Sequence, residues 1–208
     1  MSYAVKEIFL TLQGEGMQAG RRAVFLRFAG CNLWTGREQD RATAQCTFCD
    51  TDFVGMDGEN GGRYEAEALA DRVAALWGEG ARPLVVMTGG EPLLQADPEL
   101  IAALHARGFE VAVETNGTQA APAGLDWICV SPKGANPVVQ RSGDELKLVW
   151  PQSGIDPAEL LGWDFRHFII QPLDGPEREA SLQAAIALVM AEPRWRLGVQ
   201  THKLIGLP

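Results

Sequence analysis

The stretch PLVVMTGGEPLLQADPELIAALHARGFEVAVETNG (residues 83–117) has, in order, the pattern of a strand, a helix and a second strand. Residues 83–90 and 109–117 are short, valine-rich apolar runs that stop at glycine, as strands covered on both faces do. Between them, Asp97 followed by proline is a typical helix start, and Gly108 is a typical stop. The stretch therefore predicts a β-α-β unit with a right-handed crossover.

The same alternation continues outward on both sides. Further runs of strand length occupy residues 23–30, 126–134, 145–150, 166–172 and 196–202, and helical patterns occupy 64–80 and 176–193. Three helices and about six core strands are too few for a closed eight-fold barrel, which typically needs about 250 residues. We predict an α/β fold, an incomplete β/α barrel with about six parallel core strands, in a single domain spanning 1–208. An open doubly wound sheet is the alternative, and both folds bind ligands at the carboxyl ends of their strands.

Composition narrows the class of function. The chain of 208 residues has a net charge of −9, which disfavours nonspecific nucleic-acid binding and favours a small-molecule partner. There is no apolar run of membrane-spanning length, and the opening MSYAVKEIFLTLQGEG shows no secretory signal. We therefore expect a cytoplasmic enzyme without a membrane partner. In that compartment cysteines are more often ligands or catalysts than disulfides.

Three cysteines follow the run at 23–30. They are Cys31, Cys46 and Cys49, separated by fourteen and then two residues. Three thiolates on a four-iron cluster leave one iron open, which is useful when a small molecule must bind there. The intervening NLWTGREQDRATAQ is polar, and a loop of this length can bulge from the surface at modest entropic cost, with room for a helical turn.

Two interpretations other than a cluster remain open. The cysteines could be accidental buried thiols, or they could bind structural zinc, which normally takes four nitrogen or sulfur ligands. Cys129 lies inside the apolar run DWICVSP, where packing in the core is the simpler explanation. His105 and His167 each stand alone in helix or strand context, so we expect structural roles for them.

Cys-Thr-Phe-Cys (46–49), in the loop that follows the predicted strand ending at Gly30 and Cys31, and Thr-Gly-Gly-Glu-Pro (88–92), at the end of the next predicted strand, resemble motifs of the radical S-adenosylmethionine (SAM) enzymes. In that superfamily three cysteines hold a 4Fe–4S cluster, and SAM chelates the fourth iron. Its usual spacing is three residues and then two, so the first gap of this chain departs from the pattern.

Further segments narrow the resemblance. EIFLTLQGEGMQAGRRAVFLRFAGCNLW, CDT, ETNGT, SPK, QPLD and QTHKLIGLP are similar to segments of the 7-carboxy-7-deazaguanine synthases, and the similarity spans nearly the whole chain. The resemblance implies conversion of 6-carboxy-5,6,7,8-tetrahydropterin to 7-carboxy-7-deazaguanine and ammonia, toward queuosine and other deazapurines. It also implies SAM that is regenerated, Mg²⁺, a flavodoxin-like reductant and a homodimer. The alternatives are a radical SAM activase of a glycyl-radical enzyme and a zinc-binding structural module.

The resemblance also implies a set of site residues. The cluster ligands are Cys31, Cys46 and Cys49, and Thr51 binds Mg²⁺. The SAM site comprises Phe48, Cys49, Asp50, Gly90, Glu91, Ser131, Pro132, Lys133, Gln171, Pro172, Leu173 and Asp174. The substrate site comprises Leu12, Gln13, Gly14, Arg27, Thr88 and Pro208.

Chemical arguments support four of these assignments. Arg27 can pair with the pterin carboxylate as a planar fork, and Gln13 can read the pterin edge. The hydroxyl of Thr51 suits a hard ion such as Mg²⁺. We expect residues 203–208 to be too short for a helix, to pack across the mouth of the site and to bring the Pro208 carboxylate to the substrate. A surface arginine, a loop hydroxyl and a frayed terminus are the alternatives.

Overall fold

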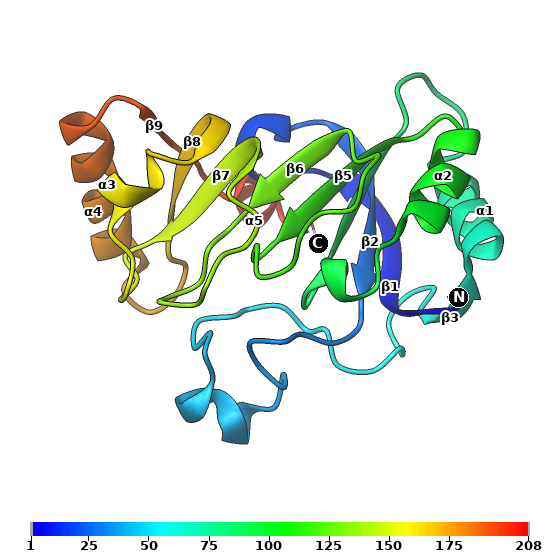
Figure 1. Ribbon diagram of the computed structural model, residues 1–208, viewed down its shortest axis with the longest axis horizontal. Coiled ribbons are helices and arrows are strands. Elements are labelled where there is room, and N and C mark those ends of the chain that lie inside the picture. The colour runs from blue at the N-terminus through cyan, green and yellow to red at the C-terminus, as the bar shows by residue number, and fades with distance from the viewer. Residues whose placement is uncertain (1, 208) are drawn as a thin grey trace.

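The computed structural model describes residues 2–207, and its main feature is one mixed sheet of nine strands (Figure 1). The strands are β1 (Ser2–Leu12), β2 (Arg22–Phe28), β3 (Gly62–Glu65), β4 (Leu84–Gly89), β5 (Glu110–Thr115), β6 (Trp127–Val130), β7 (Ser142–Trp150), β8 (Asp164–Pro172) and β9 (Trp195–Leu197). They lie in the order β3-β1-β2-β4-β5-β6-β7-β8-β9. The strands from β2 to β9 run parallel, whereas β1 is antiparallel to both β2 and β3. The sheet is open, as a partial barrel is.

Most of the helices lie near the two ends of the sheet. The helices are α1 (Ala66–Trp77), α2 (Pro98–Ala106), α3 (Pro157–Leu160), α4 (Arg178–Ala191) and α5 (Thr201–Ile205), and short 3₁₀ turns lie at Gly16–Gln18, Glu38–Thr43 and Pro92–Leu94. Figure 1 shows α1 and α2 together near one end of the sheet, with α3 and α4 near the other. None of the helices within residues 2–207 is long and apolar enough to cross a membrane.

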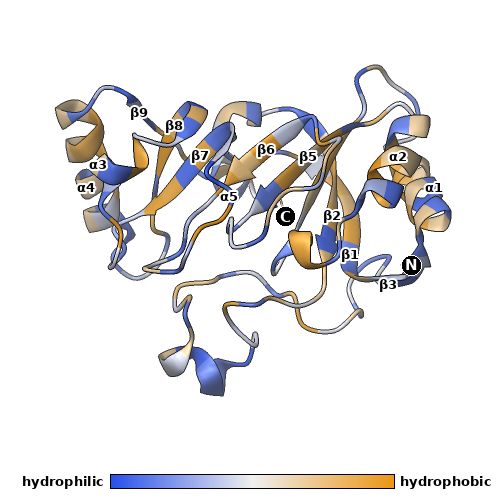
Figure 2. Cartoon of the chain, viewed as in Figure 1, coloured by the Kyte–Doolittle hydropathy of each residue, from blue (hydrophilic) through white to orange (hydrophobic). Residues whose placement is uncertain are grey.

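Alternation along the strands separates the core from the site. In β7, Leu146 and Leu148 are fully buried in a core cluster that also contains Ala185 of α4. The residue between them, Lys147, points to the other face of the sheet, because successive side chains of a strand alternate. The same alternation in β2 buries Leu26 and Phe28 in a cluster with α1 and α2. Figure 2 shows the packed strands and helix faces largely orange, and the turn at Glu38–Thr43 largely blue.

The strand and helix predictions are largely confirmed. Each of the six apolar runs between residues 23 and 172 contains a parallel strand, and the short strand β9 overlaps only the first two residues of the last run, 196–202. At the start of α2 the Asp97 side chain accepts a hydrogen bond from the Leu100 N–H at 3.0 Å, as the cap signal predicted. The expected helical turn in the long loop is present at Glu38–Thr43. The eleven-residue β1 was not among the predicted strands.

The end of the chain differs from expectation. The run at 196–202 leaves the sheet after Leu197, and Thr201–Ile205 forms α5, so the expectation that no helix follows is wrong. The physical reason is a pair of hydrogen bonds to the Gly14 carbonyl, from the N–H of Thr201 at 2.9 Å and from its hydroxyl at 3.0 Å. These bonds turn the chain away from the β8 ladder and back across the carboxyl ends of the strands.

Candidate active site

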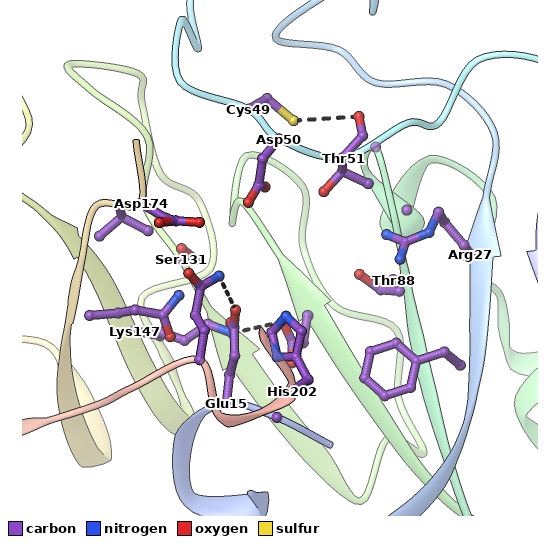
Figure 3. Close-up of a pocket in the computed structure, with 18 of the residues that line it drawn as sticks. Glu15, Arg27, Cys49, Asp50, Thr51, Thr88, Ser131, Lys147, Asp174 and His202 are labelled. Atoms are coloured by element: carbon purple, nitrogen blue, oxygen red, sulfur yellow. Dashed lines mark hydrogen bonds and ion pairs between the residues drawn. The ribbon is translucent and has the colours of Figure 1, made fainter. Parts of the chain in front are cut away.

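A cavity of about 410 Å³ lies at the carboxyl ends of the parallel strands, beneath the long loop between β2 and β3. Its walls come from β1 and the turn after it, from the ends of β2, β4, β5, β6, β7 and β8, from the loop, and from α5. Figure 3 shows side chains from these separate segments pointing into the same space. The cavity is therefore where the fold rule predicted a ligand site.

The three cysteines of the motif gather at one side of this cavity. Cys46 and Cys49 line it, and Cys31 follows β2. The thiols are close enough to interact electrostatically, and burial raises the pKa of both Cys31 and Cys46. The N–H of Leu33 donates to the Cys31 sulfur at 3.4 Å. The three sulfurs thus share one partly buried, hydrogen-bonded environment.

This donor set fits an iron–sulfur cluster better than a single ion. Among the described residues, no three His, Cys, Asp or Glu side chains converge closely enough to hold one metal ion. A cluster is bound by thiolates on different irons, so sulfurs that face a common space without meeting at a point suit it. A structural zinc ion normally needs four ligands at one centre.

Cys129 lies apart from the other three. It is fully enclosed in β6, where its thiol faces the Glu145 carboxylate at 3.6 Å, and burial raises its pKa well above the usual value. His105 pairs with Asp126 near the surface, and His167 stacks on Trp127. These three residues therefore have structural contacts outside the cysteine site.

Most residues predicted to bind SAM line the cavity. They are Phe48, Cys49, Asp50, Gly90, Ser131, Lys133, Gln171, Pro172, Leu173 and Asp174. Lys133 donates to the Ser131 hydroxyl and lies 5.8 Å from the Phe48 ring centre, and burial lowers its pKa. The Gln171 side chain is 4% exposed, and within the described part of the chain its Oε1 has no hydrogen-bond partner. That oxygen is free to accept a bond from a ligand.

Glu91 and Pro132 do not line the cavity. Glu91 is fully buried, and its carboxylate accepts hydrogen bonds from Leu93 N–H (2.9 Å), the Thr115 hydroxyl (2.7 Å) and Asn116 N–H (2.8 Å). Burial raises the pKa of this carboxyl. This side chain, which the resemblance placed in the SAM site, thus already has three protein donors, and it joins the ends of β4 and β5.

The predicted substrate residues line the other side of the cavity. Leu12, Gln13, Gly14, Arg27 and Thr88 all contribute to its wall, and Pro208 lies outside the described residues. Arg27 uses its Nε to bind Glu7 at 2.7 Å, which leaves its terminal nitrogens without a partner among residues 2–207. The Gln13 side chain is bonded at both ends, to Glu114 at 2.7 Å and to the Glu15 N–H at 3.1 Å.

Sequence reasoning missed a buried charge network beside these residues. Lys147 is 4% exposed and binds Glu15 at 2.6 Å and Glu114 at 2.8 Å, and all three line the cavity. Gln200 donates to Glu15 at 2.7 Å, and His202 also lines the wall (Figure 3). A lysine between leucines in ELKLVW was the available signal, because a charged residue inside a buried strand needs a partner.

The segment after Cys49 is fastened to β1. The Lys6 ammonium binds Asp52 and Asp57, each at 2.8 Å, and the Val54 carbonyl at 2.9 Å. Lys6 stands where the pairing of β1 with β2 shifts between Val5 and Glu7, and such bulges re-aim side chains. This clamp fixes the chain next to Thr51, which also lines the cavity.

The chain after β9 closes one side of the mouth with polar contacts. Lys203 of α5 binds Asp50 at 2.9 Å and Asp174 at 2.7 Å. The apolar residues beyond it do not cover the mouth as expected, because Leu204 is 76% and Ile205 60% exposed. Ion pairs, rather than apolar packing, hold this segment over the site.

Comparison with known proteins agrees with this geometry. Residues 39–145 match the radical SAM superfamily. The chain is 65% identical to the 7-carboxy-7-deazaguanine synthase of Caulobacter vibrioides and 61% identical to that of Bordetella pertussis, in each case over all of both chains. The crystal structure of QueE from Escherichia coli superposes with a TM-score of 0.70 at 26% identity, covering 97% of this chain and 95% of that one.

Proposed function

The chain belongs to the radical SAM superfamily and, within it, to the 7-carboxy-7-deazaguanine synthases, and on this premise we propose that it converts 6-carboxy-5,6,7,8-tetrahydropterin to 7-carboxy-7-deazaguanine and ammonia. The observation that carries the proposal is the full-length 65% identity to a synthase of that name. The cavity supports it, because Cys46 and Cys49 line one side with Cys31 close to them, and a charge network suited to a polar ring system lies on the other.

Membership of the superfamily implies a 4Fe–4S cluster and SAM. We assign the cluster to Cys31, Cys46 and Cys49, where it would supply, together with SAM, the one-electron chemistry that starts the reaction. Gly90 supports this placement, because a Cβ at that position would lie 2.1 Å from the Gly30 carbonyl oxygen and 2.7 Å from the Cys31 Cβ. Only a glycine lets the backbone that carries Cys31 pack this closely against the turn after β4.

Three further contacts are proposed for SAM from the wall between the cysteines and β8. Lys133 and Ser131 present a cation and a hydroxyl to the cavity, and Gln171 presents its unpaired oxygen. These groups suit the carboxylate, the ribose hydroxyls and an adenine amino group. In this proposal Glu91 acts indirectly, since its carboxylate already fixes the turn that carries Gly90.

The substrate is an anion with an edge rich in N–H donors, and the wall opposite the cysteines matches both properties. Arg27 is held by Glu7 so that its terminal nitrogens can bind the pterin carboxylate as a fork. Glu15 and Glu114 offer carboxylate oxygens to the ring N–H groups, and Lys147 pairs with both carboxylates. Leu12, Gly14 and Thr88 shape the same wall.

Several partners are proposed from the resemblance. We propose that Thr51 gives an oxygen ligand to Mg²⁺ beside the substrate, which the clamp of Lys6 on the adjacent Asp52 supports by fixing that segment. A flavodoxin-like reductant, a homodimer and a cytoplasmic location rest on the resemblance and on the composition of the chain.

The proposal is tested by anaerobic reconstitution. Protein supplied with iron and sulfide is incubated with SAM, a reductant, Mg²⁺ and the carboxytetrahydropterin, and the deazaguanine product is measured by mass spectrometry. We expect product from the wild type and from Cys129→Ala, but neither product nor SAM cleavage from Cys31→Ala, Cys46→Ala or Cys49→Ala. A colourless, zinc-loaded protein, or full activity in Cys31→Ala, would contradict the assignment.

A further inference from the structure

Arg41 connects the fourteen-residue insert, residues 32–45 between the first two cysteines, to the backbone around the other two. One terminal nitrogen donates to the carbonyl oxygens of Thr47 and Cys49, both at 3.0 Å. Its Nε binds the carboxylate of Glu38 at 2.8 Å, which fixes the direction of the guanidinium. The insert is therefore anchored to the Cys-Thr-Phe-Cys turn by a side chain.

The flat face of the same guanidinium holds a second part of the insert. Its carbon lies 4.1 Å from the ring centre of Trp34, a cation–π distance. Trp34 is 8% exposed, and its ring meets Phe53 edge-on at 5.7 Å. The face of the Arg41 guanidinium thus fixes the beginning of the insert through Trp34, and its N–H groups fix the turn at 46–49 through the carbonyls of Thr47 and Cys49.

Both parts that Arg41 holds direct N–H groups at cysteine sulfurs. The N–H of Leu33 donates to the Cys31 sulfur at 3.4 Å, and the N–H groups of Trp34 and Phe48 lie close enough to the sulfurs of Cys31 and Cys46 to favour their thiolates. In a planar trans peptide the carbonyl and the following N–H point in opposite directions. When Arg41 holds the Thr47 carbonyl on its own side, it therefore directs the Phe48 N–H toward the sulfur of Cys46.

We propose that Arg41 is a positioning residue that fixes the N–H donors to the sulfurs of Cys31 and Cys46 and thereby sets the reduction potential of the cluster; this inference rests on the proposed function. Hydrogen bonds to the sulfurs and nearby positive charge stabilise the more negative, reduced cluster, so they raise its potential. A lysine cannot replace the arrangement fully, because it lacks the planar face and the fork. The insert is then a support for the cluster.

The test compares three variants of the reconstituted protein. Arg41→Gln removes the fork, Arg41→Lys retains only the charge, and Arg37→Gln removes an equal charge from an exposed side chain of the same insert. Midpoint potentials come from a reductive titration followed by electron paramagnetic resonance. Electron–nuclear double resonance in H₂O and D₂O counts the exchangeable protons near the cluster.

We expect a more negative potential and fewer coupled exchangeable protons in Arg41→Gln than in both the wild type and Arg37→Gln, with Arg41→Lys intermediate. Equal potentials and equal proton couplings in Arg41→Gln and Arg37→Gln would overturn the inference while leaving the proposed function intact. If Arg41→Gln fails to retain iron, Arg41→Lys is judged against Arg37→Gln by the same two measurements. A wild-type protein that binds no cluster would overturn the proposed function and this inference together.

Discussion

At the scale of single residues, the substrate side of the cavity depends on one buried lysine. Burial alone would lower the pKa of Lys147, but Glu114 and Glu15 outweigh burial and hold that pKa well above its usual value. Burial likewise raises the pKa of Glu15, yet Lys147 and Gln200 outweigh it and lower the pKa to about 2. Lys147 is therefore a buried cation between two carboxylates, and its removal leaves both without this partner.

Lys147→Met should be strongly destabilising for this reason. Breaking a buried ion pair by removing one partner typically costs about 3–5 kcal/mol, because the remaining charge stays buried. Lys203→Met is the matched control, since Lys203 also joins two carboxylates but is 36% exposed, and exposed pairs contribute about 0–1 kcal/mol. Urea denaturation at neutral pH measures both losses, and equal losses in the two variants would contradict the network's importance.

The pH dependence of Lys147→Met gives a second, independent prediction. In the wild type the folded Glu15 has a pKa of about 2, below its unfolded value near 4.5, so its contribution is complete above pH 4.5 and is lost as pH falls toward 2. Without Lys147, this cation no longer offsets the effect of burial on the Glu15 pKa, and folding should favour the protonated form of Glu15. The stability gap between wild type and variant should therefore narrow as pH falls from 5 to 2. A constant gap across that range would exclude Lys147 as the source of the low pKa.

At the scale of elements, Glu91 holds neighbouring strand ends in register at the cavity. Glu91 follows the end of β4, and its carboxylate accepts hydrogen bonds from the Thr115 hydroxyl and the Asn116 N–H at the end of β5. Its own N–H donates to the Gly30 carbonyl after β2 at 3.0 Å. One residue thus ties three parallel strands together at the position where the first cysteine leaves the sheet.

Glu91→Gln tests this structural role against cofactor binding. One carboxylate oxygen becomes an amide NH₂ that faces an N–H donor, so a buried group is left unsatisfied at a cost of about 1–3 kcal/mol. Glu110→Gln, at the opposite end of β5 in a half-exposed pair with Arg21, is the control and should cost less. We expect the unfolding free energy of the apoprotein to fall in Glu91→Gln. Unchanged stability together with weaker SAM binding would instead support direct contact with SAM.

At the scale of the whole molecule, segments near the two ends of the chain meet over the site. Thr201 binds the Gly14 carbonyl, and a Cβ at Gly14 would lie 2.0 Å from the Nδ1 of His202, so the two segments touch directly. Lys203 then joins α5 to Asp50 beside the third cysteine and to Asp174 after β8. These contacts connect the substrate wall, the cysteine turn and the last long strand.

Two truncations separate the roles of this segment. Deletion of residues 205–208 removes exposed side chains and the Pro208 carboxylate but keeps the contacts of Thr201 and Lys203. We expect weaker pterin binding, unchanged SAM binding and little loss of stability. Deletion of 201–208 should weaken the binding of both SAM and the pterin, because the ion pair between Lys203 and Asp50 is also lost. Isothermal titration measures the affinities, and wild-type pterin affinity in the shorter truncation would remove Pro208 from the site.

The sequence by itself determined the features that depend on near neighbours. The parallel strands followed from valine-rich runs ending at glycine, and α2 followed from Asp97 and Pro98. The cysteine spacing indicated a three-thiolate site, and the resemblance led to the family before any geometry was known. These signals are local because strand and helix patterns and caps involve residues only a few positions apart.

Only the tertiary structure decided which side chains meet. Lys147 lies on β7, Glu114 on β5 two strands away in the sheet, and Glu15 after β1, and the fold brings both carboxylates to within 2.8 Å of the Lys147 ammonium. Arg41 looked like one more polar residue of a surface insert until the fold placed it over Trp34 and the Thr47 carbonyl. Burial and pairing of charges depend on contacts between residues far apart in sequence. No local pattern records those contacts, because they form only when the chain orders its strands.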